Sequence, residues 1–251
     1  MKRLTWIVMA LSLVFPAVGY AGSKLGGMTI HQAFPDDRVA KMILATVDED
    51  FDEAEKQIKA GADVNFIGTD EISPLIWVMF EARRSNDLDG LEYLLKAGAN
   101  PNYRAKQMLH ESAMSIAAGG DHLGVLELLL ENKGNPNLLG PGDDPILSIA
   151  VFERRRKNVE ILLKYGADIN APNHNRENIA SQAAALGDYE LIAYLLEQGL
   201  TYNLQNLAAT VEVTRVPPNS DAQRWKDKVI EMLTERGVKF PAFVPNERHF
   251  K

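Results

Sequence analysis

The sequence predicts an all-α solenoid of about six helix-turn-helix repeats, with turn or hairpin tips and atypical terminal repeats. The main observation is a short glycine motif, close to Gly-Ala-Asp-x-Asn, that recurs along the chain. Its copies begin at Gly61, Gly98, Gly134 and Gly166, with weaker copies at Gly199 and Gly237. These glycines are 37, 36, 32, 33 and 38 residues apart. A period of this length indicates stacked units, none of which can bury its apolar face alone.

The longer helix of each repeat is predicted immediately before its glycine. Apolar residues there follow the spacing i, i+3, i+4, which puts them on one helical stripe. The sets are Leu91/Leu94/Leu95, Leu126/Leu129/Leu130, Val159/Leu162/Leu163, Ile192/Leu195/Leu196 and Val229/Met232/Leu233. Glycine adopts the left-handed conformation that ends many helices without a Cβ clash, and the Asp or Asn after it favours a turn. Each motif therefore predicts the end of a helix followed by a turn.

A shorter apolar helix is predicted upstream of each longer one. Ser, Asp or Asn can cap its first turn, and Pro at the first helical position needs no donor. The predicted starts are 73–75, 112–114, 144–146 and 178–180. At the ends of the array, Asp36 and Asp37 begin the first helix, 50–60 is its partner, and 221–236 is the last helix.

These patterns resemble the ankyrin repeat over about residues 36 to 240. The family consensus Thr-Pro-Leu-His-x-Ala-Ala is matched by SPLIWVM at 73 to 79, SAMSIAA at 112 to 118, DPILSIA at 144 to 150 and NIASQAA at 178 to 184. A tetratricopeptide array has a similar period but lacks the glycine turn. The family histidine is replaced by Ile76, Ser115, Leu147 and Ser181. We therefore expect lower stability than in a consensus array.

Four segments are expected along the chain. They are a signal peptide at 1–21, an irregular lead-in at 22–35, the ankyrin-repeat domain at 36–240 and a C-terminal tail at 241–251. The aromatic tail is expected to fold back over the last helix, which no further repeat covers; the alternative is a disordered tail that binds a partner. Insertions at 81–89 and 216–220 are expected in loops, either as tolerated surface additions or as part of the binding face.

The expected signal peptide has the three parts that export requires. Lys2 and Arg3 precede an apolar run from Leu4 to Phe15, and small residues end at Ala21, where cleavage is predicted. A run of about 12 residues is shorter than the ~20 that span a bilayer, and no later segment is long and apolar enough. We therefore expect an exported product, periplasmic in a Gram-negative host, with no integral membrane span in the mature chain.

Composition and motifs exclude several classes of activity. The chain holds 34 acidic and 27 basic residues, a net charge of −7, which disfavours broad binding to nucleic acid or anionic lipid. Without cysteine there is no thiolate nucleophile, disulfide or Cys-ligated metal. The five histidines show no helical metal pairing, and there is no phosphate loop or serine elbow. We therefore predict no enzyme, no cofactor and no metal site.

Two charged runs have alternative interpretations. Asp48-Glu49-Asp50 with Asp52-Glu53 could attract calcium but lacks the spacing and glycine of a calcium loop, so we favour ordinary helix N-terminal acids. The basic run 154–157 is predicted to be a solvated turn, with an anion site or the recognition of an acidic patch as alternatives.

The ankyrin resemblance implies a concave partner-binding face made by the tips and the exposed side of each first helix. Carried over position by position, it selects several large apolar residues and one acid as partner-binding candidates. They are Ile72, Phe80, Glu81, Tyr103, Leu138, Leu139, Val151 and Phe152. Trp77 falls where the family carries a buried leucine, so it is assigned to the core.

The resulting functional hypothesis is a non-catalytic protein-binding module in the periplasm. The chain resembles two groups of small exported bacterial ankyrin proteins. Members of the first are immunity proteins that neutralise a cognate secreted toxin, such as a type VI lipase or cell-wall effector. Members of the second are helpers of periplasmic stress-protection enzymes. We prefer the immunity protein, with a toxin enzyme as partner, and keep the helper or scaffold as the alternative. Two further classes of function remain. One is an enzyme with an unseen active site, and the other is a structural or small-ligand role in the envelope.

Overall fold

The computed structural model describes residues 27–106 and 111–242, and the expected signal peptide and residues 243–251 lie outside this part. The chain forms two compact units. Of the described residues, unit 1 comprises 27–101 with 105–106, and unit 2 comprises 102–104 with 111–242. Apart from isolated bridge residues, among them the pair Leu139 and Pro145, the regular structure in the described part is helical, as the all-α prediction requires.

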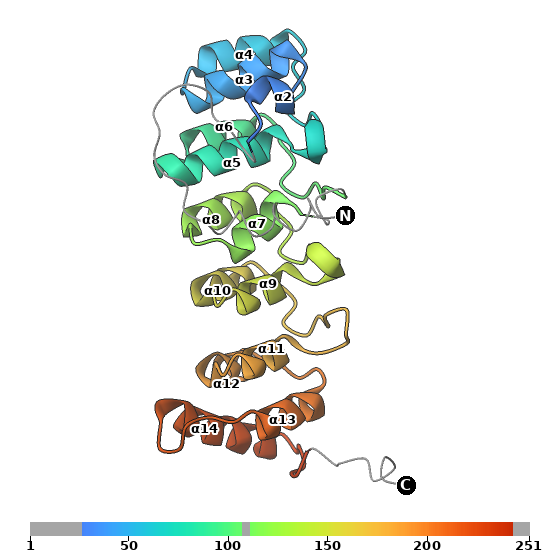
Figure 1. The fold of residues 1–251 in the computed structure, drawn as a ribbon, viewed down its shortest axis with the longest axis vertical. Helices are drawn as coiled ribbons and strands as arrows, with labels where there is room; N and C mark the ends of the chain where they lie inside the picture. Colours follow the sequence, from blue (N-terminus) through green and yellow to red (C-terminus); the bar gives the residue numbers. More distant parts are fainter. Residues whose placement is uncertain (1–26, 107–110, 243–251) are drawn as a thin grey trace. The chain divides into compact units, whose positions relative to one another are not determined.

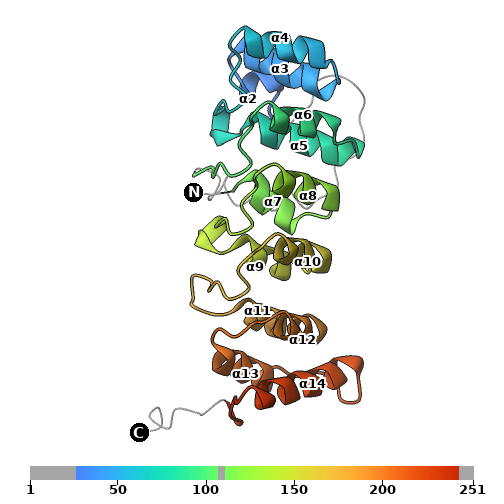
Figure 2. The same cartoon turned by 180° about the vertical axis from the view of Figure 1, so that it is seen from behind.

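Both units are built from antiparallel helix pairs (Figure 1, Figure 2). Unit 1 contains α2 (Ile30–Ala33), α3 (Asp37–Val47), α4 (Phe51–Lys59), α5 (Pro74–Ser85), α6 (Asp89–Lys96) and the short 3₁₀ helix η1 (Thr69–Glu71). Unit 2 contains α7 (Ala113–Gly119), α8 (Leu123–Glu131), η2 (Pro141–Asp143), α9 (Ile146–Phe152), α10 (Arg156–Lys164), α11 (Ile179–Ala185), α12 (Tyr189–Glu197), α13 (Leu204–Val213) and α14 (Asp221–Glu235).

The core of unit 1 confirms the assignment of Trp77. Its side chain is 1% exposed and meets the Phe34 ring edge-on at a centroid distance of 5.7 Å. Phe34 follows the short helix α2, so the lead-in is more regular than expected: its last residues bury apolar side chains instead of running loosely over the surface.

The glycines end the longer helices as predicted, with one exception. Gly61, Gly98 and Gly166 have φ between +89° and +99°, the left-handed region. In the third motif Lys133 takes the positive φ instead, and Gly134 serves a different purpose. A Cβ on Gly134 would lie 2.5 Å from Met114 Sδ and 2.6 Å from the Leu129 carbonyl oxygen. Glycine is needed there for close packing rather than for the turn.

Three of the four predicted caps on the shorter helices are present. The side chains of Ser73, Ser112 and Asn178 each accept a backbone N–H of the first turn. Asp144 does not cap α9, because Pro145 is the N-cap residue and the Asp144 carboxylate accepts the backbone N–H of His174 at 2.8 Å. That acid links two neighbouring tips instead.

One insertion departs from its expected position. Of residues 81–89, Glu81 to Ser85 lengthen α5 to 12 residues, whereas α7, α9 and α11 have 7 each. Within this added segment Glu81 and Arg84 pair at i, i+3, a spacing that supports helix formation. The insertion 216–220 does lie between α13 and α14, as predicted.

The first residues of the tail lie against α13. The Gln205 side-chain amide donates to the Lys239 carbonyl at 3.1 Å, and the Ala242 N–H donates to Glu212 Oε2 at 2.7 Å. The aromatic tail residues expected to cover the last helix, α14, lie at 243–251, outside the described residues, so that cover stays a prediction.

An asparagine ladder (Asn65, Asn102, Asn137 and Asn170) joins consecutive glycine turns. Each amide group donates to a carbonyl at the end of the next longer helix and accepts a backbone N–H of the following turn. In unit 1, Asn65 bonds Gly98 O at 3.0 Å and Asn100 N at 2.7 Å. The other three rungs belong to unit 2. The Asn of the repeated motif therefore satisfies backbone groups that a helix end leaves without partners.

Candidate partner-binding surface

The candidates in unit 1 have different exposures. Ile72 is 4% exposed, so the prediction that it lies on an open surface is wrong. Its carbonyl accepts the Gly68 N–H at 2.9 Å, which closes the tip and turns the Ile72 side chain into the core directly before α5. Phe80 and Glu81 are partly buried on the last turns of α5, and Glu81 pairs with Arg84 at 2.5 Å.

The end of α9 separates two neighbouring candidates. Val151 is 1% exposed, so it too was wrongly assigned to the surface. It lies four residues after Leu147, which is also buried, and both face the core because i and i+4 share one helical face. Phe152 lies about 100° further round the helix and is 62% exposed. The exposed apolar candidate on this helix is therefore Phe152.

The tip before α9 carries the other exposed candidate. Leu139 forms the bridge with Pro145, and its side chain is 40% exposed. Leu138 is partly buried, and its carbonyl accepts the Ile146 N–H at 3.0 Å. Tyr103, which also belongs to unit 2, is partly buried.

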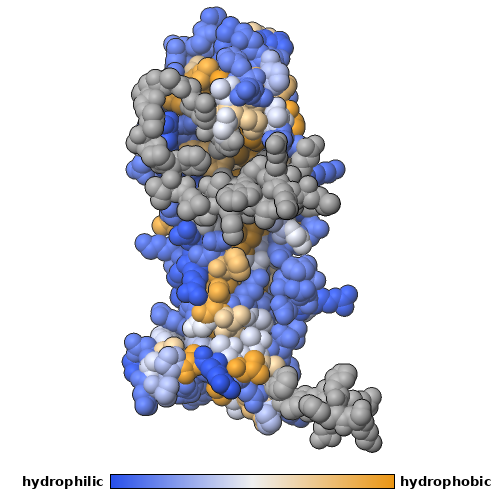
Figure 3. Space-filling model, viewed as in Figure 1, coloured by the Kyte–Doolittle hydropathy of each residue, from blue (hydrophilic) through white to orange (hydrophobic). Residues whose placement is uncertain are grey.

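Val213, at the end of α13, is an exposed apolar residue that the sequence reasoning missed. It is 56% exposed, and it directly precedes the loop formed by the insertion 216–220, which was the available signal. Figure 3 shows apolar surface, bordered by hydrophilic surface, at the level of α9 and α11 in unit 2. With Leu139 and Phe152, unit 2 thus exposes apolar side chains at one tip and at the ends of two first helices.

The basic turn between α9 and α10 is largely occupied by internal contacts. Arg154 donates to the Leu186 carbonyl at 3.2 Å, and Arg155 donates to the Gly119 carbonyl at 3.0 Å. These bonds tie the turn to the ends of α11 and α7. Instead of being solvated as expected, these two arginines connect the turn to the neighbouring helices.

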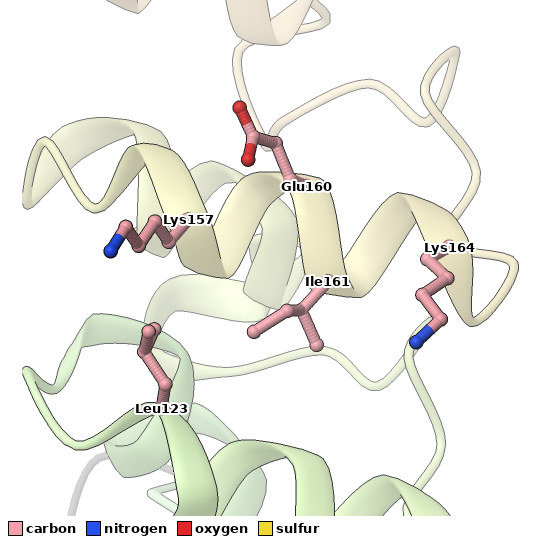
Figure 4. A pocket seen from close by; sticks show the side chains of 5 residues that line it. All are labelled: Leu123, Lys157, Glu160, Ile161 and Lys164. Atoms are coloured by element: carbon pink, nitrogen blue, oxygen red, sulfur yellow. The ribbon is translucent and has the colours of Figure 1, made fainter.

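A shallow groove of about 270 Å³ lies between α8 and α10 of unit 2 (Figure 4). Leu123 and Ile161 supply its apolar side chains, and Lys157, Glu160 and Lys164 border it. It belongs to the second helices of their pairs, and none of the residues selected from the sequence lines it.

Three exposed carboxylates come together in unit 1. One carboxylate oxygen from each of Glu49, Asp87 and Asp89 lies within 4.8 Å of the others; Glu49 and Asp87 are in the turns before α4 and α6, and Asp89 is the first residue of α6. Gly90 permits this approach, because a Cβ there would lie 2.7 Å from the Thr46 carbonyl oxygen. The negative charge of Asp87 raises the pKa of the Glu49 carboxyl, and the Asp87 hydrogen bond, desolvation and Asp89 add to the rise. The acid Asp50 in the same run caps α4, as expected.

Replacing Asp87 by asparagine is expected to stabilise the protein at pH 7. A carboxyl whose folded pKa is raised lowers stability as the pH rises from its unfolded pKa through its folded pKa. Asparagine keeps the side-chain oxygen that accepts the Asp89 N–H, so only the repulsion is removed. Thermal unfolding at low salt should show the gain at pH 7 and none below about pH 3, where the Glu49 carboxyl is protonated in both the folded and the unfolded state. Glu231→Gln on α14 is the matched control, and an equal gain there would contradict the local origin.

Membrane crossing by the described helices is excluded by their length and polarity: none has the long apolar stretch that a span requires.

The chain is similar to known proteins in the way its repeats suggest. A family model described as "Ankyrin repeats (3 copies)" matches residues 78–173. An ankyrin repeat protein of Fowlpox virus is 27% identical over 178 residues, which cover 68% of this chain and 51% of the viral protein. The human transient receptor potential cation channel subfamily A member 1 is 31% identical over 119 residues, 47% of this chain and 10% of the channel. Protein lin-12 of Caenorhabditis elegans is 32% identical over 124 residues, 47% of this chain and 8% of that protein. The chain thus spans about half or less of these relatives.

Proposed function

Because the chain belongs to the ankyrin-repeat family, we propose that it is a non-catalytic protein-binding module whose partner contacts the exposed apolar side chains of unit 2. The family is generally a protein-interaction module, which supports this class of function. The matched segment, 78–173, includes Leu139 and Phe152.

The observation that carries the proposal is the exposure of Phe152. An aromatic side chain that is 62% exposed beside the fully buried Val151 has no role in the core. Aromatic residues of this kind often supply a large share of binding free energy when a partner buries them. Leu139, in the tip before α9, and Val213, at the end of α13, are further exposed apolar side chains of unit 2, so a folded partner could contact more than one repeat.

Phe152→Ala is expected to weaken partner binding by about 1 to 3 kcal/mol without lowering the melting temperature. Its side chain contributes little to stability because most of it is exposed. A partner isolated by co-purification with the wild-type chain would be titrated calorimetrically against both proteins. Trp225→Ala on α14 is the aromatic control. Undiminished affinity would place the interface elsewhere, and a lowered melting temperature would make Phe152 part of the core.

We propose further that the protein is a periplasmic immunity protein that neutralises a cognate secreted toxin by direct binding. The leader-like sequence at 1–21 supports export, and blocking an active-site cleft needs a shaped surface and no chemistry. Cells carrying Phe152→Ala should then become sensitive to the cognate toxin. Binding to a periplasmic enzyme without protection from any toxin would favour the helper role instead.

A further inference from the structure

The basic run 154–157 leaves one cation without an internal partner. Arg154 and Arg155 donate to backbone carbonyls, and Arg156 pairs with Glu160 at 2.8 Å while lying 4.1 Å from the centroid of the Tyr194 ring. Among the described residues, Lys157 forms neither an ion pair nor a hydrogen bond. It is exposed on the first turn of α10.

Lys164, on the last turn of α10, also lacks a carboxylate partner within the described part of the chain. Its ammonium group lies over the Tyr165 ring, 5.5 Å from the ring centroid. The other lysines of the described helices have carboxylate or carbonyl partners. They are Lys41, Lys56, Lys59, Lys96, Lys226 and Lys228. Among the lysines of the described helices, only these two on α10 lack a carboxylate or carbonyl partner.

These two lysines flank the apolar part of the α8/α10 groove. Figure 4 shows Ile161 between Lys157 and Lys164 on α10, with Leu123 facing them from α8. Lys157 and Lys164 are seven residues apart, which is about 10 Å along a helix axis. Glu160, the acid at the border, is already paired with Arg156. The groove thus offers an apolar centre with a free positive charge toward each end.

We propose that the α8/α10 groove docks an acidic amphipathic helix of a partner protein. Grooves between helices accept the apolar face of another helix, and carboxylates seven residues apart on that helix would match the spacing of the two lysines. A leucine-sized side chain between these carboxylates would contact Leu123 and Ile161. The positive charges determine the place and orientation of docking, because the rest of the chain is acidic overall.

The inference rests on the proposed function only in taking the partner to be a protein. It concerns the second helices of their pairs and shares no residue with the surface that contains Leu139 and Phe152. Phe152→Ala therefore tests the proposed function, and changes on α10 test the groove. If binding is lost at one of these two surfaces, binding at the other can still be measured.

The probe is a capped, alanine-rich helical peptide with Glu, Leu and Glu at positions i, i+4 and i+7. Its matched peptide carries Gln in place of both Glu residues. Each would be titrated into the full ¹⁵N-labelled chain at low salt. We expect the Glu peptide to shift backbone resonances of α8 and α10 and to bind at least about fivefold more tightly than the Gln peptide. Equal binding of the two peptides, or no binding of the Glu peptide at millimolar concentration, would overturn the proposal.

Lys157→Gln combined with Lys164→Gln should weaken binding of the Glu peptide about tenfold, and Ile161→Gln should weaken it in a variant whose circular dichroism and melting temperature are retained. Lys106→Gln with Lys239→Gln changes the net charge equally at residues that do not line the groove, and it should leave binding unchanged. An equal loss in this control would show mere charge attraction and overturn the proposal. It would also be overturned if the groove lysines governed binding to phosphatidylglycerol vesicles while the Glu peptide bound wild type and variant alike.

Discussion

Leu162→Ala and Leu195→Ala are each expected to lower the free energy of unfolding by about 2 to 5 kcal/mol. Both side chains are fully buried on the second helices α10 and α12. Truncation removes apolar contact and leaves a cavity that the neighbouring repeats fill only in part. For a protein of ordinary stability this is a large fraction of the total, so urea denaturation followed by circular dichroism would measure it readily.

Leu163→Ala is the matched control for Leu162→Ala, since it truncates the next residue of the same helix. Leu163 is only partly buried, so its loss should cost clearly less. Because each repeat is stabilised by its neighbours, the destabilisation by Leu162→Ala should also reach the amides of α8 and α12 in hydrogen exchange. Equal urea midpoints for the wild type, Leu162→Ala and Leu163→Ala would mean that the helical register is wrong.

Asn158→Ala is expected to destabilise the protein by about 1 to 3 kcal/mol, although asparagine is a polar residue on a helix. Its side chain is 1% exposed, and its amide nitrogen donates to the carbonyls of Ala117, Ala118 and Gly120 at 3.2, 2.8 and 2.9 Å. These carbonyls lie at the end of α7, where no further turn of helix can supply donors. Alanine would leave buried acceptors without partners.

Lys157→Ala is the control for this change, because it truncates the preceding residue, which is exposed. Its effect on the unfolding free energy should stay within about 0.5 kcal/mol. Thermal melts of the two variants at equal concentration provide the comparison. If Asn158→Ala melted with the control, water would have to replace the lost amide at all three carbonyls.

The sequence predicted the repeats because they depend on local chemistry. The glycine spacing, the apolar i, i+3, i+4 sets and the cap residues act within one or two turns of helix, and Leu162, Leu195 and Trp77 are buried as predicted. Where a prediction needed contacts between separate helices or between repeats, it was less accurate. Gly134 approaches Met114 of a neighbouring helix, and the Asp144 carboxylate accepts from His174 of the next tip.

The candidate surface was predicted less well because exposure changes from one residue to the next. Val151 and Phe152 are consecutive and both apolar, and only their direction relative to the core distinguishes them. The ankyrin resemblance places exposed positions only to within about one residue, so it selected both Val151 and Phe152. Arg154 and Arg155 donate to carbonyls more than 30 residues away in the sequence. The basic composition of the run 154–157 does not reveal these partners, and it therefore indicated a solvated turn.

The asparagine ladder divides each repeat into a constant part and a replaceable part. Its four asparagines are spaced by 37, 35 and 33 residues, yet every one makes the same pair of bonds to the following turn. Differences in repeat length, whether in a tip or in a helix such as α5, are thus absorbed between rungs without altering any rung. A tip could be lengthened, or exchanged for one from another protein, while the attachment of its repeat stays the same. Specificity and stacking can therefore change separately, both in natural divergence and in the construction of chimeric binders.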